Sequence, residues 1–292
     1  MRVLVTGGSG FLGSHIADEA FLRGHEVRIF DDTASPWLLE GQQEILGDVL
    51  DRAALCEALQ DCDVVFHCAA IADLYAARQN PRRAIEVNVV GTLSAMEAAA
   101  RAGVRRFMYA SSVYVYSRSG SIYRTTKQAA ENIVRDLSPD LGLEPTILRY
   151  GSLYGPRADP DNAIFRLVKM AVSERKIDFW GDGKEVREYI HIRDAAALSV
   201  DAISSEFSGV AVHITGRERL TTEEVIDVIC ETLGGGITVS YSDENFEGRY
   251  RSTPYSHTPD IGRRLVGNTY IDLGLGLLEQ IQSVSDVAIG EG

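Results

Sequence analysis

A glycine-rich turn near the N-terminus constrains the fold of this chain more than any other feature. Residues 2–5 form a short apolar run, long enough for one buried strand, and a helical pattern begins at Phe11. Between them lies the motif Gly8-x-Gly10-x-x-Gly13. Glycines in this position let the backbone turn tightly and approach a pyrophosphate, while the N-terminus of the helix attracts the anion. The turn therefore predicts a dinucleotide-binding strand–turn–helix unit.

The next predicted strand, residues 26–30, ends at an acidic residue, Asp31. A carboxylate about 20 residues after the glycines is the position that binds the adenosine ribose in such units. It would accept hydrogen bonds from a ribose 2′-hydroxyl and repel a 2′-phosphate, so we expect NAD(H) to be preferred over NADP(H). The glycines alone could form only a tight loop. The strand, helix and acid together favour a cofactor site.

The first half of the chain alternates apolar strands with helical patterns, which is typical of a doubly wound α/β fold with a parallel sheet. Ligands bind such sheets at the carboxyl ends of the strands. The further strands are expected at 64–67, 106–110 and 146–149, and the helices at 51–59, 82–101 and 121–137.

Composition changes after residue 156, and a helix predicted from Asp194 should pack back on the first domain, so the second, smaller domain is expected to be discontinuous in sequence. We expect a NAD-binding Rossmann domain over 1–156, plus about 186–205, and a substrate-binding domain over 157–185 and 206–292. Within the latter, Thr221 and Glu224 have the spacing of a capping box that opens a helix.

Composition also limits the class of protein. The chain has 292 residues and a formal net charge of −13, which argues against a nucleic-acid surface. No apolar run approaches the ~18 residues of a membrane span, and the N-terminus has no signal-peptide pattern, so we expect a cytoplasmic protein. The four cysteines do not form a C-x-x-C pair, which predicts reduced thiols and no metal site.

Tyr123 and Lys127 are four residues apart in a helical pattern and share one face of the helix. A nearby ammonium lowers the pKa of a phenol, so the tyrosine can act as a general base on an alcohol. Ser111 and Ser112 follow a neighbouring strand and could orient the same oxygen. This spacing alone is common on solvated helix faces, but downstream of the glycine-rich turn it favours catalysis.

The chain resembles the extended short-chain dehydrogenase/reductase family, within it the nucleotide-sugar epimerases and dehydratases, and its opening is most similar to the UDP-galactose 4-epimerases. The resemblance covers nearly the whole chain. Its motifs lie at 6–15, 47–48, 67–70, 88–92, 110–112, 123–127, 148–156 and 181–191.

The resemblance implies roles for individual residues. Ser112, Tyr123 and Lys127 would be catalytic, with Lys127 also binding the nicotinamide ribose. The further cofactor contacts would be Gly7, Gly10, Phe11, Leu12, Gly13, Asp31, Asp48, Val49, Ala69, Ala70, Asn88 and Tyr150. The substrate contacts would be Ser111, Ser152, Asn162, Trp180, Arg187 and Arg249, with Arg251 as an alternative to the last.

Some of these roles have alternatives. Arg187 would bind the diphosphate of a nucleotide sugar, but it could instead form a surface ion pair with Glu185 or Glu188. Trp180 could belong to the core. The role of Asn88 could instead be limited to a hydrogen bond within its own helix.

Departures from the family pattern narrow the reaction. The dehydratases place Asp-Glu after the catalytic hydroxyl residue, where this chain has Val113 and Tyr114, and the decarboxylases use a Glu in the same segment. The loop over 117–122 is shorter than in relatives, and Ser152 replaces the usual Asn. We therefore expect epimerisation of a nucleoside-diphosphate sugar, at C4. The alternatives are a 4-ketoreductase or dehydrogenase and, least favoured, a non-catalytic NAD(H)-sensing protein.

The family also implies a homodimer that pairs the helices predicted at 82–101 and 121–137. Apolar residues on these helices are the candidate contacts, although each could face the sheet of its own subunit. They are Leu93, Met96, Ala129, Ile133 and Val134.

Overall fold

The computed structural model describes residues 1–242, and its main element is a seven-stranded parallel sheet. The strand order is β10-β6-β5-β4-β1-β2-β3, so the chain starts in the middle of the sheet and winds outward in both directions. This confirms the predicted doubly wound fold. The strands are β1 (Arg2–Thr6), β2 (Glu26–Asp31), β3 (Gln43–Leu46), β4 (Val64–His67), β5 (Arg106–Ser112), β6 (Glu144–Tyr150) and β10 (Ala211–Ile214).

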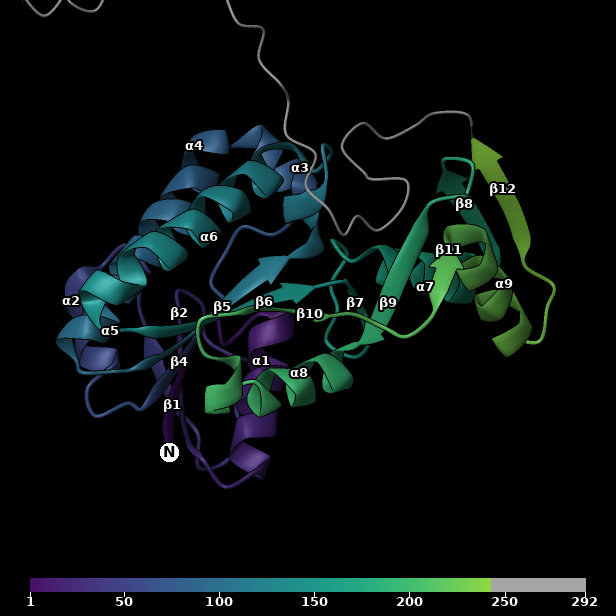
Figure 1. Ribbon diagram of the computed structural model, residues 1–292. Helices are drawn as coiled ribbons and strands as arrows, with labels where there is room; N and C mark the ends of the chain where they lie inside the picture. Colours follow the sequence, from purple (N-terminus) through teal and green to yellow (C-terminus); the bar gives the residue numbers. More distant parts are fainter. Residues whose placement is uncertain (243–292) are drawn as a thin grey trace, which may run out of the picture. The chain divides into compact units, whose positions relative to one another are not determined.

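Helices cover both faces of this sheet (Figure 1). Because side chains alternate along a strand, Val3 and Val5 pack against one helical layer and Leu4 packs against the other. One layer contains α1 (Phe11–Leu22) and α8 (Ile192–Asp201). The other contains α2 (Arg52–Ala58), α5 (Gly91–Arg101) and α6 (Ser121–Leu141), with α3 (Leu74–Gln79) and α4 (Pro81–Ile85) beside them.

The helix predicted over 82–101 is interrupted by a wider turn. It begins as α4, passes through the π-helical segment η1 (Glu86–Val90) and continues as α5. A π-helical turn inserts one extra residue into the ladder of hydrogen bonds and often marks a functional site. Apolar periodicity does not reveal such an insertion.

A smaller group of elements follows the sixth strand. It contains a three-stranded sheet, a two-stranded sheet and two helices that share a separate apolar cluster around Leu167, Phe179 and Ile226 (Figure 1). The capping box of Thr221 and Glu224 is confirmed at the start of α9. The elements are β7 (Ser152–Tyr154), α7 (Ala163–Glu174), β8 (Lys176–Trp180), β9 (Val186–His191), β11 (Arg219–Thr221), α9 (Thr222–Thr232) and β12 (Thr238–Ser242).

Two short strands pair across a predicted domain boundary. Residues 206–292 were assigned to the smaller domain, yet β10 pairs with β6 at the edge of the large sheet. β9 falls in the 186–205 range predicted for the Rossmann domain, and it pairs with β7, from the same predicted domain, and with β11, from the other one. Short strands have little sequence signal for their partners, because pairing depends on which edge the rest of the fold leaves open.

Two of the predicted dimer contacts are wrong. Met96 and Val134 are completely buried and belong to the core between α5, α6 and the sheet. Leu93, Ala129 and Ile133 are half-buried. Among residues 1–242, no helix has both the length and the apolar character needed to span a membrane.

Candidate active site

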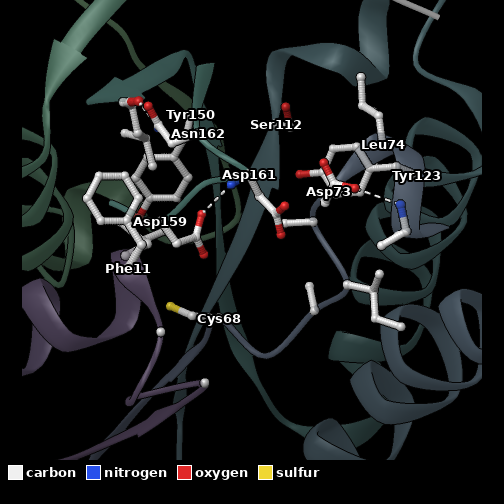
Figure 2. Close-up of a pocket in the computed structure, with 18 of the residues that line it drawn as sticks. Phe11, Cys68, Asp73, Leu74, Ser112, Tyr123, Tyr150, Asp159, Asp161 and Asn162 are labelled. Atoms are coloured by element: carbon white, nitrogen blue, oxygen red, sulfur yellow. Dashed lines mark hydrogen bonds between the residues drawn. The ribbon is translucent and has the colours of Figure 1, made fainter. Parts of the chain in front are cut away.

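A large pocket of about 1310 Å³ lies at the carboxyl ends of the central strands and extends to the smaller group of elements. Its wall contains the turn after β1, the ends of β2, β4, β5 and β6, and residues of α6, α7, β8 and β9. Figure 2 shows Tyr123, Leu74 and Asp73 toward one side of this pocket and Tyr150, Asn162 and Asp159 toward the other. The carboxyl-end position agrees with the crevice rule for open parallel sheets.

The glycine-rich turn has the geometry of a pyrophosphate cradle. Gly7 has a φ of +68°, and a Cβ atom on it would lie 2.7 Å from the backbone nitrogen of Ala69. A Cβ on Gly13 would lie only 2.1 Å from the carbonyl oxygen of Gly7. Side chains are thus excluded at both positions, and no side chain caps the N-terminus of α1 at Gly10. Backbone N–H groups there can face an anionic ligand, so the residues fit a dinucleotide.

Asp31 lies at the end of β2 on the pocket wall, beside this turn. Its carboxylate accepts hydrogen bonds from the backbone nitrogens of Ser9 at 3.0 Å and Thr33 at 3.2 Å. Burial raises the pKa of Asp31, while these two hydrogen bonds act in the opposite direction. An ionised carboxylate has room for about four accepted bonds, so it can still bind a ribose hydroxyl.

Asp48 and Val49 line the pocket, as predicted for residues near the adenine. The Asp48 carboxylate accepts a hydrogen bond from the backbone nitrogen of Leu50 at 2.9 Å and forms an ion pair with Arg83 at 2.9 Å. These contacts lower its pKa. Arg83 comes from α4 and also lines the pocket. No local sequence pattern indicates it, because only the fold brings it to Asp48.

Asn88 does not have the predicted place. Ala69 and Ala70 line the pocket, but Asn88 is buried and is not one of the lining residues. Its side-chain oxygen accepts from the Ile71 nitrogen at 2.7 Å, and its nitrogen donates to the Ile71 carbonyl and to Thr126, both at 3.0 Å. Its amide is thus engaged by the protein. We correct the expected cofactor contact to support of the segment that follows Ala70.

The three catalytic candidates line one pocket but come from two elements. Ser112 ends β5, and its hydroxyl accepts a hydrogen bond from the Tyr114 nitrogen at 3.2 Å, which starts the short helix η2 (Val113–Tyr116). Lys127 lies in α6, where it is buried, and its ammonium donates to the Ala110 carbonyl at 2.7 Å. Burial lowers the pKa of Lys127 to about 8.

Tyr123 lies one turn before Lys127 in α6 and is largely buried. Its ring meets the ring of Tyr114 edge-on, with centroids 6.2 Å apart. Ala77 of α3 and Ala84 of α4 belong to the same apolar cluster. This packing fixes the ring, while Tyr123 and Ser112 both line the pocket (Figure 2).

The substrate candidates from the smaller group of elements also line the pocket. Arg187 lies in β9 and is buried. Trp180 is 63% exposed, which rules out the alternative that it belongs to the core. Asn162 caps α7 through the Phe165 nitrogen at 3.0 Å and donates to the Leu153 carbonyl at 2.8 Å, so its amide mainly shapes the wall.

The remaining predicted residues have less direct roles. Ser152 lines the pocket from β7. The Tyr150 hydroxyl shares a hydrogen bond of 2.6 Å with Ser199, and burial raises its pKa. Ser111 borders the pocket, but its hydroxyl donates to Glu131 at 2.6 Å inside the protein, so we correct its role from substrate contact to support. Arg249 and Arg251 lie outside the described residues.

The fold and this site define an NAD-binding enzyme of the short-chain dehydrogenase/reductase type, with a dinucleotide cradle and a Ser–Tyr–Lys set in one pocket. Residues 3–214 match the family described as "NAD dependent epimerase/dehydratase family". The chain belongs to this family.

Individual relatives are similar over most of their length. A Bacillus subtilis protein named an uncharacterized UDP-glucose epimerase is 28% identical over 84% of this chain and 86% of its own. A Bacillus cytotoxicus UDP-N-acetyl-alpha-D-glucosaminuronate decarboxylase is 29% identical over 77% of this chain and 78% of its own. The solved structure of Thermus thermophilus UDP-glucose 4-epimerase in complex with NAD has a TM-score of 0.80 and 27% identity, and covers 88% of this chain and 90% of that one.

Proposed function

We propose that this protein is an NAD-dependent 4-epimerase of a UDP-linked hexose. The observation that carries the proposal is the single pocket that Ser112, Tyr123 and Lys127 share with the glycine-rich turn and Arg187. The pocket thus combines an acid–base set, a dinucleotide cradle and a buried cation suited to a diphosphate. The names of the relatives support uridine diphosphate as the carrier.

In this mechanism Tyr123 removes the proton from the C4 hydroxyl of the sugar, and Ser112 orients the same oxygen. When NAD⁺ is bound, it supplies the acceptor for the C4 hydride and the donor that returns it. Lys127 places a cation on the same helix face as Tyr123, where it favours the deprotonated phenol. Tyr123 then returns the proton to the oxygen after the sugar has presented its other face.

The segment after Ser112 supports epimerisation over the related reactions. Elimination of water or loss of a carboxyl group in this family needs an acid in that segment. Here Val113 is buried, and the ring of Tyr114 packs against Tyr123. Val113 has no ionisable group, and Tyr114 has a phenol where the related reactions use a carboxyl group.

The test is a turnover assay followed by proton NMR. We expect purified protein with bound NAD to convert UDP-glucose to UDP-galactose with no added reductant, since an epimerase restores its cofactor in each cycle. UDP-glucuronate and GDP-, CDP- and dTDP-sugars should be run in parallel. Turnover that consumes added NADH in proportion to product would instead identify a 4-ketoreductase. NAD binding without turnover of any nucleotide sugar would leave only the non-catalytic alternative.

We infer that the smaller group of elements binds the nucleotide sugar, because Asn162, Trp180 and Arg187 all reach the pocket from it. We also infer a cytoplasmic location, which the four free thiols support because such thiols persist in a reducing compartment.

We further propose a homodimer through the outer surfaces of α4, α5 and α6. Ile85 of α4 and Val90 of η1, the segment between α4 and α5, are large apolar residues that stay exposed, at 44% and 46%. We expect light scattering at micromolar concentration to give twice the monomer mass, and Val90→Glu to shift the protein toward monomer by placing a charge in the contact. Leu198→Glu is the control, because Leu198 is equally exposed, at 45%, on the opposite helical layer. A monomeric wild-type mass would contradict this proposal.

A further inference from the structure

A buried carboxylate that the mechanism does not use lies one turn beyond Lys127 in α6. Glu131 is 2% exposed, and its two oxygens accept hydrogen bonds from the Arg149 guanidinium at 2.9 and 2.5 Å. It also accepts from the Ser111 hydroxyl at 2.6 Å and from Arg135 at 2.7 Å. Tyr123, Lys127 and Glu131 thus occupy successive turns of one helix face.

This helix face holds the end of β5 at two consecutive residues. Lys127 donates to the carbonyl of Ala110, and Glu131 accepts from the hydroxyl of Ser111. Ser112 is the next residue in the chain. The two contacts therefore fix the position of Ser112 relative to the helix that carries Tyr123.

The ion pair between Glu131 and Arg149 also contacts the part of the chain that follows Ser112. Arg149 of β6 donates to the Tyr116 hydroxyl, and its guanidinium lies 4.6 Å from the centroid of the Tyr116 ring. Tyr116 ends η2, the short helix that Ser112 begins, and its hydroxyl also contacts His213 of β10 at 3.0 Å. Ser112 thus lies between two points, Ser111 and Tyr116, that are both tied to the Glu131–Arg149 pair.

We infer that Glu131 is a positioning residue for catalysis: paired with Arg149, it fixes Ser112 against Tyr123 and balances the buried charge of Lys127. This inference rests on the proposed function.

The effect of the Glu131 charge on the pKa of Lys127 has a defined direction. Burial lowers the pKa of Lys127, and the negative charge of Glu131 acts against that decrease. Among residues 1–242, the other titratable groups near the ammonium are His67 and Cys68 at the end of β4, Tyr109 of β5, and Tyr123. Glu131 itself stays ionised. Its burial would raise its pKa, but hydrogen bonds from Arg149 and Ser111 and the charges of Arg149 and Arg135 lower it overall. Loss of Glu131 should therefore lower the pKa of Lys127 further.

The composition of the chain allows a direct measurement, because lysine occurs only at positions 127, 169, 176 and 184. Protein labelled with ¹³Cε-lysine and saturated with NAD can be titrated by NMR, with the Lys127 signal assigned from Lys127→Arg. We expect Lys127 of Glu131→Gln to lose its proton at lower pH than in wild type. The alkaline limb of its kcat profile should move to lower pH as well.

The expected rates separate positioning from binding. Glu131→Gln should lower kcat about tenfold with little change in KM, which is below the 10²-fold cost of a full ångström of misplacement. The matched control is Arg135→Gln, which removes an exposed partner of the same carboxylate and should behave as wild type. Ser111→Ala removes only the link to β5, so its kcat should fall while the Lys127 titration stays as in wild type.

A purely structural role would give a lower melting temperature in Glu131→Gln with an unchanged Lys127 titration and an unchanged kcat profile, and that result overturns the inference. If Glu131→Gln does not fold, the kcat and KM of Ser111→Ala test the inference instead. A change in KM without a change in kcat counts against a positioning role. Wild-type protein without epimerase activity contradicts the proposed function separately, because the lysine titration needs no substrate.

Discussion

Replacement of Tyr123 by phenylalanine should lower epimerase turnover by ~10²–10⁴-fold, the range typical of a lost general acid–base group. The ring and its edge-on contact with Tyr114 remain in this variant, so the pocket wall keeps its shape. NAD affinity should therefore change little. The measurement is kcat by proton NMR on UDP-glucose, together with the NAD dissociation constant from calorimetry.

Tyr114→Phe is the matched control for this prediction. It removes a hydroxyl from the neighbouring tyrosine, which also lines the pocket, and it keeps both rings. We expect a much smaller loss of turnover than in Tyr123→Phe. Equal losses in the two variants, or a near-normal rate in Tyr123→Phe, would remove Tyr123 from the mechanism and leave only the cofactor site.

The second large effect is expected at Asp31. NAD⁺ should bind at least about 10²-fold more tightly than NADP⁺, because juxtaposing a carboxylate with a 2′-phosphate costs several kcal/mol and each 1.4 kcal/mol is tenfold in affinity. Asp31→Ala should reduce this preference by weakening NAD⁺ binding and relieving the repulsion of NADP⁺. Dissociation constants for both cofactors at pH 8, where the carboxyl group is ionised despite its raised pKa, measure the effect.

Asp32→Ala tests whether the preference belongs to Asp31 in particular. Asp32 is the next residue, also lines the pocket and carries the same charge, but it is exposed. Its removal should change the preference much less than Asp31→Ala. Similar effects at the two positions would mean that the general negative charge of this loop discriminates between the cofactors.

The local sequence determined the glycine-rich turn and the strands next to it. The predicted segments 2–5 and 26–30 fall within β1 and β2, and Gly7, Gly13 and Asp31 lie on the pocket wall as predicted. These features are local: a turn that excludes side chains needs glycine, and a strand that ends in an acid places it beside that turn. The Tyr123–Lys127 spacing was equally readable, because helical periodicity alone puts both on one face.

The partners of the site residues were decided only by the tertiary structure. Arg83 forms an ion pair with Asp48, and Glu131 accepts a hydrogen bond from the Ser111 hydroxyl. The side-chain amide of Asn88 accepts a hydrogen bond from the backbone nitrogen of Ile71. Each pair joins residues 17 to 35 positions apart in the sequence. Their meeting depends on how α4, η1 and α6 pack against the sheet, which no local pattern encodes.

The assignment of β9 and β10 to their sheets was decided in the same way. The sequence by itself determined that an apolar segment would become a strand and that a turn restricted to glycine would follow it, because these outcomes depend on local backbone conformation and side-chain chemistry. The tertiary structure alone decided which edge each short strand joined and which polar side chains became buried partners, because those outcomes depend on distant parts of the chain packing together.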